Sequence, residues 1–112
     1  MINLLLETIA VLEDNNVFGS DVEWCGSETF GWFSWKDFED IAKDIEYDDS
    51  FGTSYIPMDL VIVGHNWWLE RGEYDGSEWW EFKKKPEKPN EYKKLIKLID
   101  PNCFSLKELN QD

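Results

Sequence analysis

The sequence has few of the residues that catalytic, metal-binding and disulfide-rich proteins use. Its 112 residues include one histidine, His65, and two cysteines, Cys25 and Cys103. Two thiols so far apart make neither a zinc motif nor the paired cysteines of a secreted scaffold. No serine-nucleophile signature occurs, and the stretch YDDS at 47–50 lacks the residue order of a calcium loop. We therefore expect a protein that is not an enzyme and that needs no metal ion or cofactor.

Basic side chains are scarce in the first three quarters of the chain. Residues 1–82 hold 19 acidic and 3 basic side chains, a balance of −16, whereas residues 83–112 hold 5 acidic and 8 basic, a balance of +3. So negative a region repels nucleic acid and attracts cationic surfaces. We expect a basic protein as partner and no direct contact with nucleic acid.

Long apolar runs are also missing. The N-terminal stretch MINLLLETIAVLEDNN carries acidic residues and no preceding basic region, so we expect neither a signal peptide nor a membrane span. The few cysteines fit a cytoplasmic protein. No linker long enough to separate two cores occurs, and we expect a single domain over residues 1–112.

Helices are predicted by apolar spacing and capping residues. The first covers residues 4–14, with Asn3 as its cap. The second begins after Ser34, with Asp37 completing a capping box. A third is expected over 91–99 and a last turn over 106–110. The apolar positions of the first two helices are Leu5, Leu6, Ile9 and Leu12, and Phe38, Ile41, Ala42 and Ile45.

Strands are predicted by β-branched and aromatic runs between turn residues. The chain has a hairpin pattern within 22–33, an apolar strand at 59–64, and two strands on either side of Asp75 and Gly76, a dipeptide typical of tight hairpin turns. The sequence therefore predicts an α+β fold. We expect an antiparallel meander of three to five strands with two to three helices packed on one face.

Two pairs of adjacent tryptophans, Trp67/Trp68 and Trp79/Trp80, flank this turn. Neighbouring residues in a strand point to opposite faces, so each pair gives one indole to each face. We expect the tight turn to bring the two pairs to the same level. Two interpretations stay open: the outward indoles are an aromatic ladder beside the core, or they form a recognition patch for a protein or a sugar.

Aspartates line one side of the second predicted helix. Asp37, Asp40 and Asp44, continued by Asp48 and Asp49, make a row of carboxylates sparser than the phosphates of DNA. An arginine-rich groove built for nucleic acid would accept such a row through charge-assisted hydrogen bonds. The alternative is a solvated outer surface.

The segment WWLERGEYDGSEWWEF at 67–82, together with the rest of residues 32–89, resembles a group of small phage and prophage proteins of Gram-positive bacteria, a group without an assigned activity. The resemblance implies a protein of the bacterial host cytoplasm. Small acidic phage proteins include anti-CRISPR proteins, several of which mimic DNA or plug basic channels of Cas effectors. The likeness to these is one of size and charge.

Our leading hypothesis is a non-enzymatic, acidic inhibitor that binds a basic nucleic-acid-handling protein, such as a CRISPR–Cas nuclease, by mimicking nucleic acid or blocking a channel. The alternative is a small, aromatic-rich ligand-binding or structural module. The residues expected to contact the partner are Asp37, Asp40, Asp44, Asp48, Asp49, Trp68, Glu70, Glu73, Glu78 and Trp79.

Overall fold

A computed structural model describes residues 1–50, 52–102 and 105–111. Its helices are α1 (Leu4–Asp14), α2 (Trp35–Ala42) and α3 (Leu106–Leu109), with a 3-10 turn at Gly19–Asp21. Its strands are β1 (Ile2–Asn3), β2 (Trp24–Ser27), β3 (Gly31–Phe33), β4 (Glu46–Tyr47), β5 (Val61–Val63), β6 (Trp67–Tyr74) and β7 (Ser77–Lys84).

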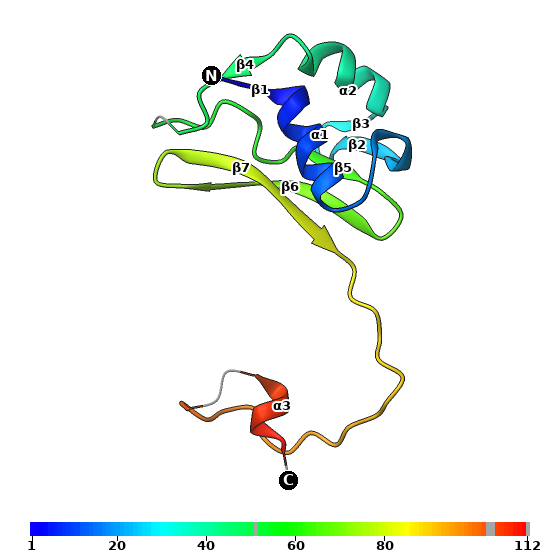
Figure 1. The fold of residues 1–112 in the computed structure, drawn as a ribbon, viewed down its shortest axis with the longest axis vertical. Helices are drawn as coiled ribbons and strands as arrows, with labels where there is room; N and C mark the ends of the chain where they lie inside the picture. Colours follow the sequence, from blue (N-terminus) through cyan, green and yellow to red (C-terminus); the bar gives the residue numbers. More distant parts are fainter. Residues whose placement is uncertain (51, 103–104, 112) are drawn as a thin grey trace.

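Five strands form one antiparallel sheet in the order β3-β2-β5-β6-β7, and β1 pairs with β4 in a small second sheet (Figure 1). The long hairpin β6–β7 turns at Asp75 and Gly76, whose φ angles of 50° and 85° are those of a tight hairpin turn. The α+β class and the antiparallel sheet expected from the sequence are confirmed.

The two tryptophan pairs do not lie at the same level. Trp67 is opposite Lys84, and Trp80 is opposite Arg71. A two-residue turn pairs residues that are equally distant from it, but Trp67 lies eight positions before Asp75 whereas Trp80 lies only four after Gly76. The expected cross-strand contact between the pairs is therefore wrong.

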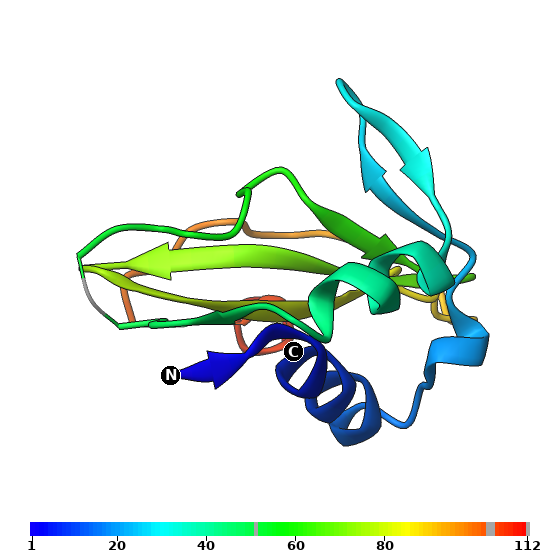
Figure 2. The ribbon, with the colours of Figure 1, turned by 90° about the horizontal axis from the view of Figure 1, so that it is seen from above.

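Helices α1 and α2 cover one face of the large sheet (Figures 1 and 2). A buried hydrogen bond of 2.8 Å from Trp80 Nε1 to Thr8 Oγ1 joins β7 to α1. The apolar core between these layers consists of Leu4, Leu12, Cys25, Phe38, Ala42, Tyr47, Ile56, Ile62, Trp67, Leu69 and Trp80.

The helices bury some of the predicted apolar residues and not others. Leu12, Phe38 and Ala42 belong to the core as predicted. Leu6 of α1 and Ile41 of α2 are 67% and 69% exposed, and the polar Thr8 is fully buried. Thr8 takes a core position because its hydroxyl accepts the Trp80 indole N–H and donates to the Leu4 carbonyl, 2.7 Å away. Apolar spacing alone does not reveal a polar residue that is buried with its hydrogen bonds satisfied.

No helix forms over residues 91–99. After β7 the chain runs away from the sheet, on the side opposite the helices (Figures 1 and 2). An isolated nine-residue helix is marginal in water, and in this structure the segment lies away from the sheet that could stabilise it (Figure 1). The radius of gyration, 18.3 Å, exceeds the value of about 13 Å for a compact chain of this length because of this segment. Within the described residues, no helix has the length and apolar character that crossing a bilayer requires.

Candidate functional site

The residues expected to contact the partner are divided between two sides of the molecule. Asp37 and Asp40 belong to α2, and Asp44 follows it, on the side that the helices cover. Trp68, Glu70 and Trp79 instead belong to the opposite face of the sheet. The sheet separates the two groups, so one flat partner surface cannot contact both.

Two of the α2 aspartates have local structural partners. The carboxylate of Asp37 accepts from the Ser34 backbone N–H at 3.3 Å, and the Ser34 hydroxyl accepts from the Asp37 N–H at 3.1 Å, which completes the predicted capping box. Asp40 pairs with Lys36 at 2.8 Å, and this hydrogen bond lowers the pKa of Asp40. All three aspartates are exposed, but Asp37 and Asp40 already have partners within the chain, so fewer carboxylates of the predicted row are available to a partner.

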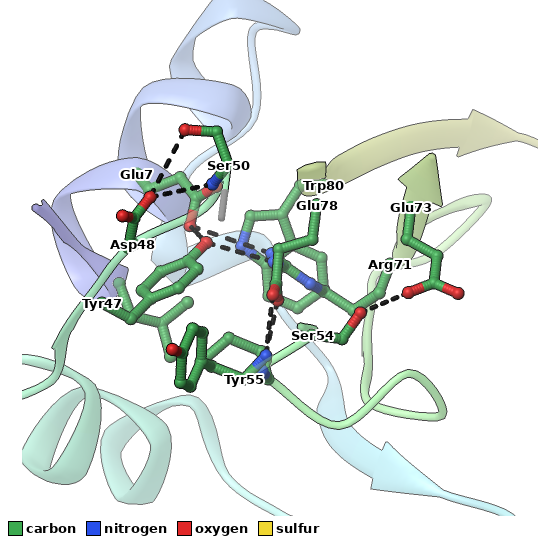
Figure 3. Close-up of polar contacts among 12 residues, drawn as sticks. Glu7, Tyr47, Asp48, Ser50, Ser54, Tyr55, Arg71, Glu73, Glu78 and Trp80 are labelled. Carbon is green, nitrogen blue, oxygen red and sulfur yellow. Dashed lines mark hydrogen bonds and ion pairs between the residues drawn. The ribbon is translucent and has the colours of Figure 1, made fainter. Parts of the chain in front are cut away.

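Three other predicted contact residues fasten the loop that follows β4. The Asp48 carboxylate accepts from the Ser50 N–H at 3.0 Å, and the Glu73 carboxylate accepts from the Ser54 hydroxyl (Figure 3). Asp49 is half-buried, and its backbone carbonyl accepts from the Glu78 N–H at 2.7 Å. The Glu73 carboxylate and the Asp49 backbone thus attach the loop to the hairpin, whereas the Asp48 carboxylate makes its contact within the loop.

Glu78 is buried and cannot contact a partner. Its side chain is 1% exposed, and its carboxylate lies 2.9 Å from Arg71 Nη2 and accepts from the Tyr55 N–H at 2.7 Å (Figure 3). The alternation of β7 places Glu78 on the same face as Trp80, which is the helix-covered face. This alternation was visible in the sequence, but the buried Arg71 that compensates the charge was not predicted.

Arg71 is the centre of a closed polar cluster that joins α1, β4, β6 and β7 (Figure 3). Its guanidinium donates to Tyr47 Oη at 3.1 Å, lies 3.8 Å from Glu7 Oε1 and stacks 4.7 Å from the Trp80 ring centroid. Burial raises the pKa of Glu7, against the lowering effects of its hydrogen bond from Tyr47 and of the Arg71 charge. The side chains of Arg71, Glu7 and Glu78 are 0%, 10% and 1% exposed, so the cluster is buried and holds the hairpin against α1 and β4.

The other face of the sheet is rich in indoles, and no described helix or strand packs on it. Trp68 lies beside Val63 on β5, which in turn lies beside Trp24 on β2. Four of the seven tryptophans belong to this face. We name it the indole face, and its residues are Trp24, Trp32, Val61, Val63, Trp68, Glu70, Trp79 and Glu81. The sequence pointed to Trp68, Glu70 and Trp79; the alternation within residues 24–33 was the signal that could have added Trp24 and Trp32.

Two carboxylates lie directly opposite each other on the indole face. Glu70 of β6 is paired with Glu81 of β7, and like charges in such a pair are destabilising. Each accepts a hydrogen bond from an indole: Trp68 Nε1 donates to Glu70 at 2.8 Å, and Trp79 Nε1 donates to Glu81 at 3.2 Å. Lys83 offsets part of this charge from 3.2 Å. A further cation bound here would be favoured.

A groove of about 460 Å³ runs over the indole face beside this pair. Trp24, Val61, Val63 and Trp68 give it apolar walls, and its polar lining comes from Ser27, Glu28, Thr29 and Asp59. A second hollow of about 520 Å³ adjoins it, lined by Glu23, Trp24, Ser27, Gly31 and Trp32. Indole walls beside carboxylates suit a lysine or arginine side chain, which has an apolar stem and a cationic end.

Among the described residues, no group of three or more histidine, cysteine, aspartate or glutamate side chains is placed to hold a metal ion. Comparison of the chain with protein-family models, with curated proteins and with solved structures found no match.

Proposed function

We propose that this protein is a non-enzymatic binding module that holds a basic segment of a protein partner on its indole face. The observation that carries the proposal is a sheet face with four tryptophans, on which no described helix or strand packs (Figure 1), and a groove in it that Trp24 and Trp68 line together with Glu28 and Asp59. Tryptophans dominate the binding energy of interfaces because they bury a large area at low entropic cost.

In the proposed complex, the methylene stem of a lysine or arginine packs between Trp24 and Trp68, and its charge lies against Glu28 and Asp59 in the wall of the groove. The indoles attract this cation through cation–π interactions and the carboxylates attract it through their charge, so both favour binding. The overall negative charge speeds the approach of a cationic partner, so association should slow as salt is added.

A basic nucleic-acid-handling protein such as a CRISPR–Cas nuclease stays our proposal for the partner, because such proteins carry cationic segments. The contact surface differs from the one expected from the sequence. Mimicry of nucleic acid by α2 is less well supported, since Asp37 caps the helix and Asp40 is paired with Lys36. Blocking through the indole face fits the geometry better.

Titration with a synthetic peptide of alternating lysine and leucine tests the proposal, with the indole N–H resonances as readout. We expect Trp68→Ala to weaken binding about tenfold, the loss typical of an interface tryptophan. Asp59→Asn, which removes a groove carboxylate, should weaken it several-fold, whereas the charge-matched control Asp44→Asn, on the helix side, should not. Equal losses for the two aspartate variants would favour a non-specific charge effect, and no loss for any variant would rule out the indole face.

A further inference from the structure

We propose that the first occupant of the indole face is the chain's own C-terminal segment, residues 86–99, which docks there in the free protein and must leave before a partner binds. The proposal depends on the function proposed above in one respect: it takes the ligand of the indole face to be a basic segment with apolar side chains.

The segment has the chemistry that the groove requires. It carries four lysines, and five of its apolar side chains are more than half exposed: Tyr92, Leu95, Ile96, Leu98 and Ile99. Leaving such side chains in water is unfavourable, since burying one aliphatic side chain is worth about 1.5–3 kcal/mol. With four lysines and two glutamates the segment has a charge balance of +2, whereas residues 1–82 have −16. The segment therefore complements the indole face in two ways: its apolar side chains match the tryptophans, and its positive charge matches the carboxylates.

The segment also leaves the sheet at the right place. The Lys85 N–H donates to the Asn66 carbonyl at 2.7 Å, which fixes the chain at the end of β7. Lys83, two residues earlier, lies beside Trp68, and the strand order continues through Val63 to Trp24. Strands are about 4.8 Å apart, so Trp24 is about 15 Å from the strand that the segment leaves.

Six extended residues span about 20 Å, so the stretch 86–91 is long enough to bring Tyr92 and the residues after it over the groove. Pro86 and Pro89 favour an extended chain there. In both views the segment already lies on the side of the sheet that the helices leave open (Figures 1 and 2). Docking leaves the sheet, α1 and α2 in place. Helix α3 moves together with the segment, because Asn110 holds it to Ile96 and Lys97 through hydrogen bonds of 2.8 Å.

Covalent connection makes weak docking sufficient. A short flexible linker gives a tethered ligand an effective concentration in the millimolar range. A segment with only millimolar intrinsic affinity would therefore occupy the face about half of the time. The occupied fraction reduces the apparent affinity for any other ligand of the same face. The segment thus acts as a competitor that salt weakens, because its lysines face carboxylates.

Paramagnetic broadening in the full-length chain tests the docking. A nitroxide is attached to a cysteine introduced by Asn102→Cys, with Cys103→Ser. Cys25 needs no replacement because it is fully buried, and burial raises the pKa of its thiol to about 12. We expect the indole resonances of Trp24 and Trp68 to broaden far more than that of Trp35, which belongs to α2. About 0.5 M salt should abolish this selective broadening, because it screens the attraction between the lysines and the carboxylates. Equal broadening of the three indoles, or none, would overturn the proposal.

A mixture of spin-labelled chains and unlabelled, ¹⁵N-enriched chains distinguishes docking within one molecule from exchange between two. We expect no selective broadening in the mixture. Broadening of Trp24 and Trp68 in the enriched chains would mean that the segment of a second copy occupies the face, which would contradict docking within one chain.

Two charge-matched double variants separate this proposal from the one on which it depends. Lys93→Gln/Lys94→Gln alters the segment, and Lys36→Gln/Lys43→Gln removes the same charge from the helix side. We expect the first to abolish selective broadening and to bind the lysine–leucine peptide about twofold or more tightly, and the second to do neither. If the segment does not broaden the indoles but the peptide still shifts them, self-docking is wrong and the proposed function stands. If the peptide also fails, both are wrong.

Discussion

Arg71 is the residue on which the packing of the hairpin against the helices most depends. Its side chain is fully buried and is the cation facing both Glu78 and Glu7. Arg71→Met would leave two carboxylates buried without a counter-charge, and we expect a loss of about 3–5 kcal/mol in the free energy of unfolding, measured by urea denaturation. Adding Glu78→Gln should recover part of the loss. A cost below about 1 kcal/mol for Arg71→Met would contradict this role.

Glu7 should make the stability of the protein depend on pH in an unusual direction. Its pKa is raised by burial, so the folded state binds a proton more readily than the unfolded state. Stability from this group is therefore full below its ordinary pKa and decreases as pH rises through the raised value. Glu7→Gln removes this effect, because glutamine resembles the protonated acid.

Unfolding free energies of wild type and Glu7→Gln, measured from pH 4 to pH 7, test this argument. We expect the variant to gain stability relative to wild type as pH increases. Carboxylates far from Glu7 titrate alike in both proteins, so their contributions cancel in the difference. Asp49 and Glu78 act on Glu7 through their charges, so the difference reports Glu7 together with these two neighbours. A difference that stays constant, or that changes in the opposite direction, would show that Arg71 and Tyr47 compensate the burial of Glu7 completely.

Among the helices and strands, the sequence predicted correctly the features that local interactions determine, namely the helix caps and the hairpin turn. Asn3 and Ser34 cap α1 and α2 as predicted, and Asp75–Gly76 forms the predicted turn. The predictions failed where tertiary contacts decide. The burial of Glu78 depends on Arg71, seven residues away and on the neighbouring strand. The helical pattern over residues 91–99 forms no helix, and its apolar side chains stay exposed because no described helix or strand covers them.

The turn of the β6–β7 hairpin has little tolerance for a side chain at Gly76. Its φ of 85° is unfavourable for other residues, and an added Cβ would lie 2.8 Å from the backbone nitrogen of Gly52. We expect Gly76→Ala to reduce the unfolding free energy by about 1–3 kcal/mol. Asp75→Asn should be nearly neutral, since asparagine also accepts positive φ. Thermal unfolding of both variants checks the turn, and a neutral Gly76→Ala would contradict the observed geometry.

For the whole molecule, the helices bury one face of the sheet and leave tryptophans and carboxylates on the other. The sequence predicted that outward indoles exist, but it could not show which side the helices cover, because each tryptophan pair serves both faces. Nor could it show that the α2 aspartates and the indole face lie on opposite sides. Only the packing of α1 and α2 decides which carboxylates share a surface with the indoles.

The same organisation predicts that residues 1–85 fold without the C-terminal segment. The buried apolar core lies between Leu4 and Trp80, and the apolar side chains described after Lys85 are mostly exposed. We expect a chain ending at Lys85 to unfold cooperatively in urea, within about 1 kcal/mol of full length, because truncation removes no core contact. The measurement should be made in about 0.5 M salt, where docking of the segment is weak. The slope of the unfolding free energy against urea should also be little changed, since it reports the surface buried on folding. A chain that loses cooperativity on truncation would show that the segment is part of the fold, and regulation by its release would then be impossible without unfolding.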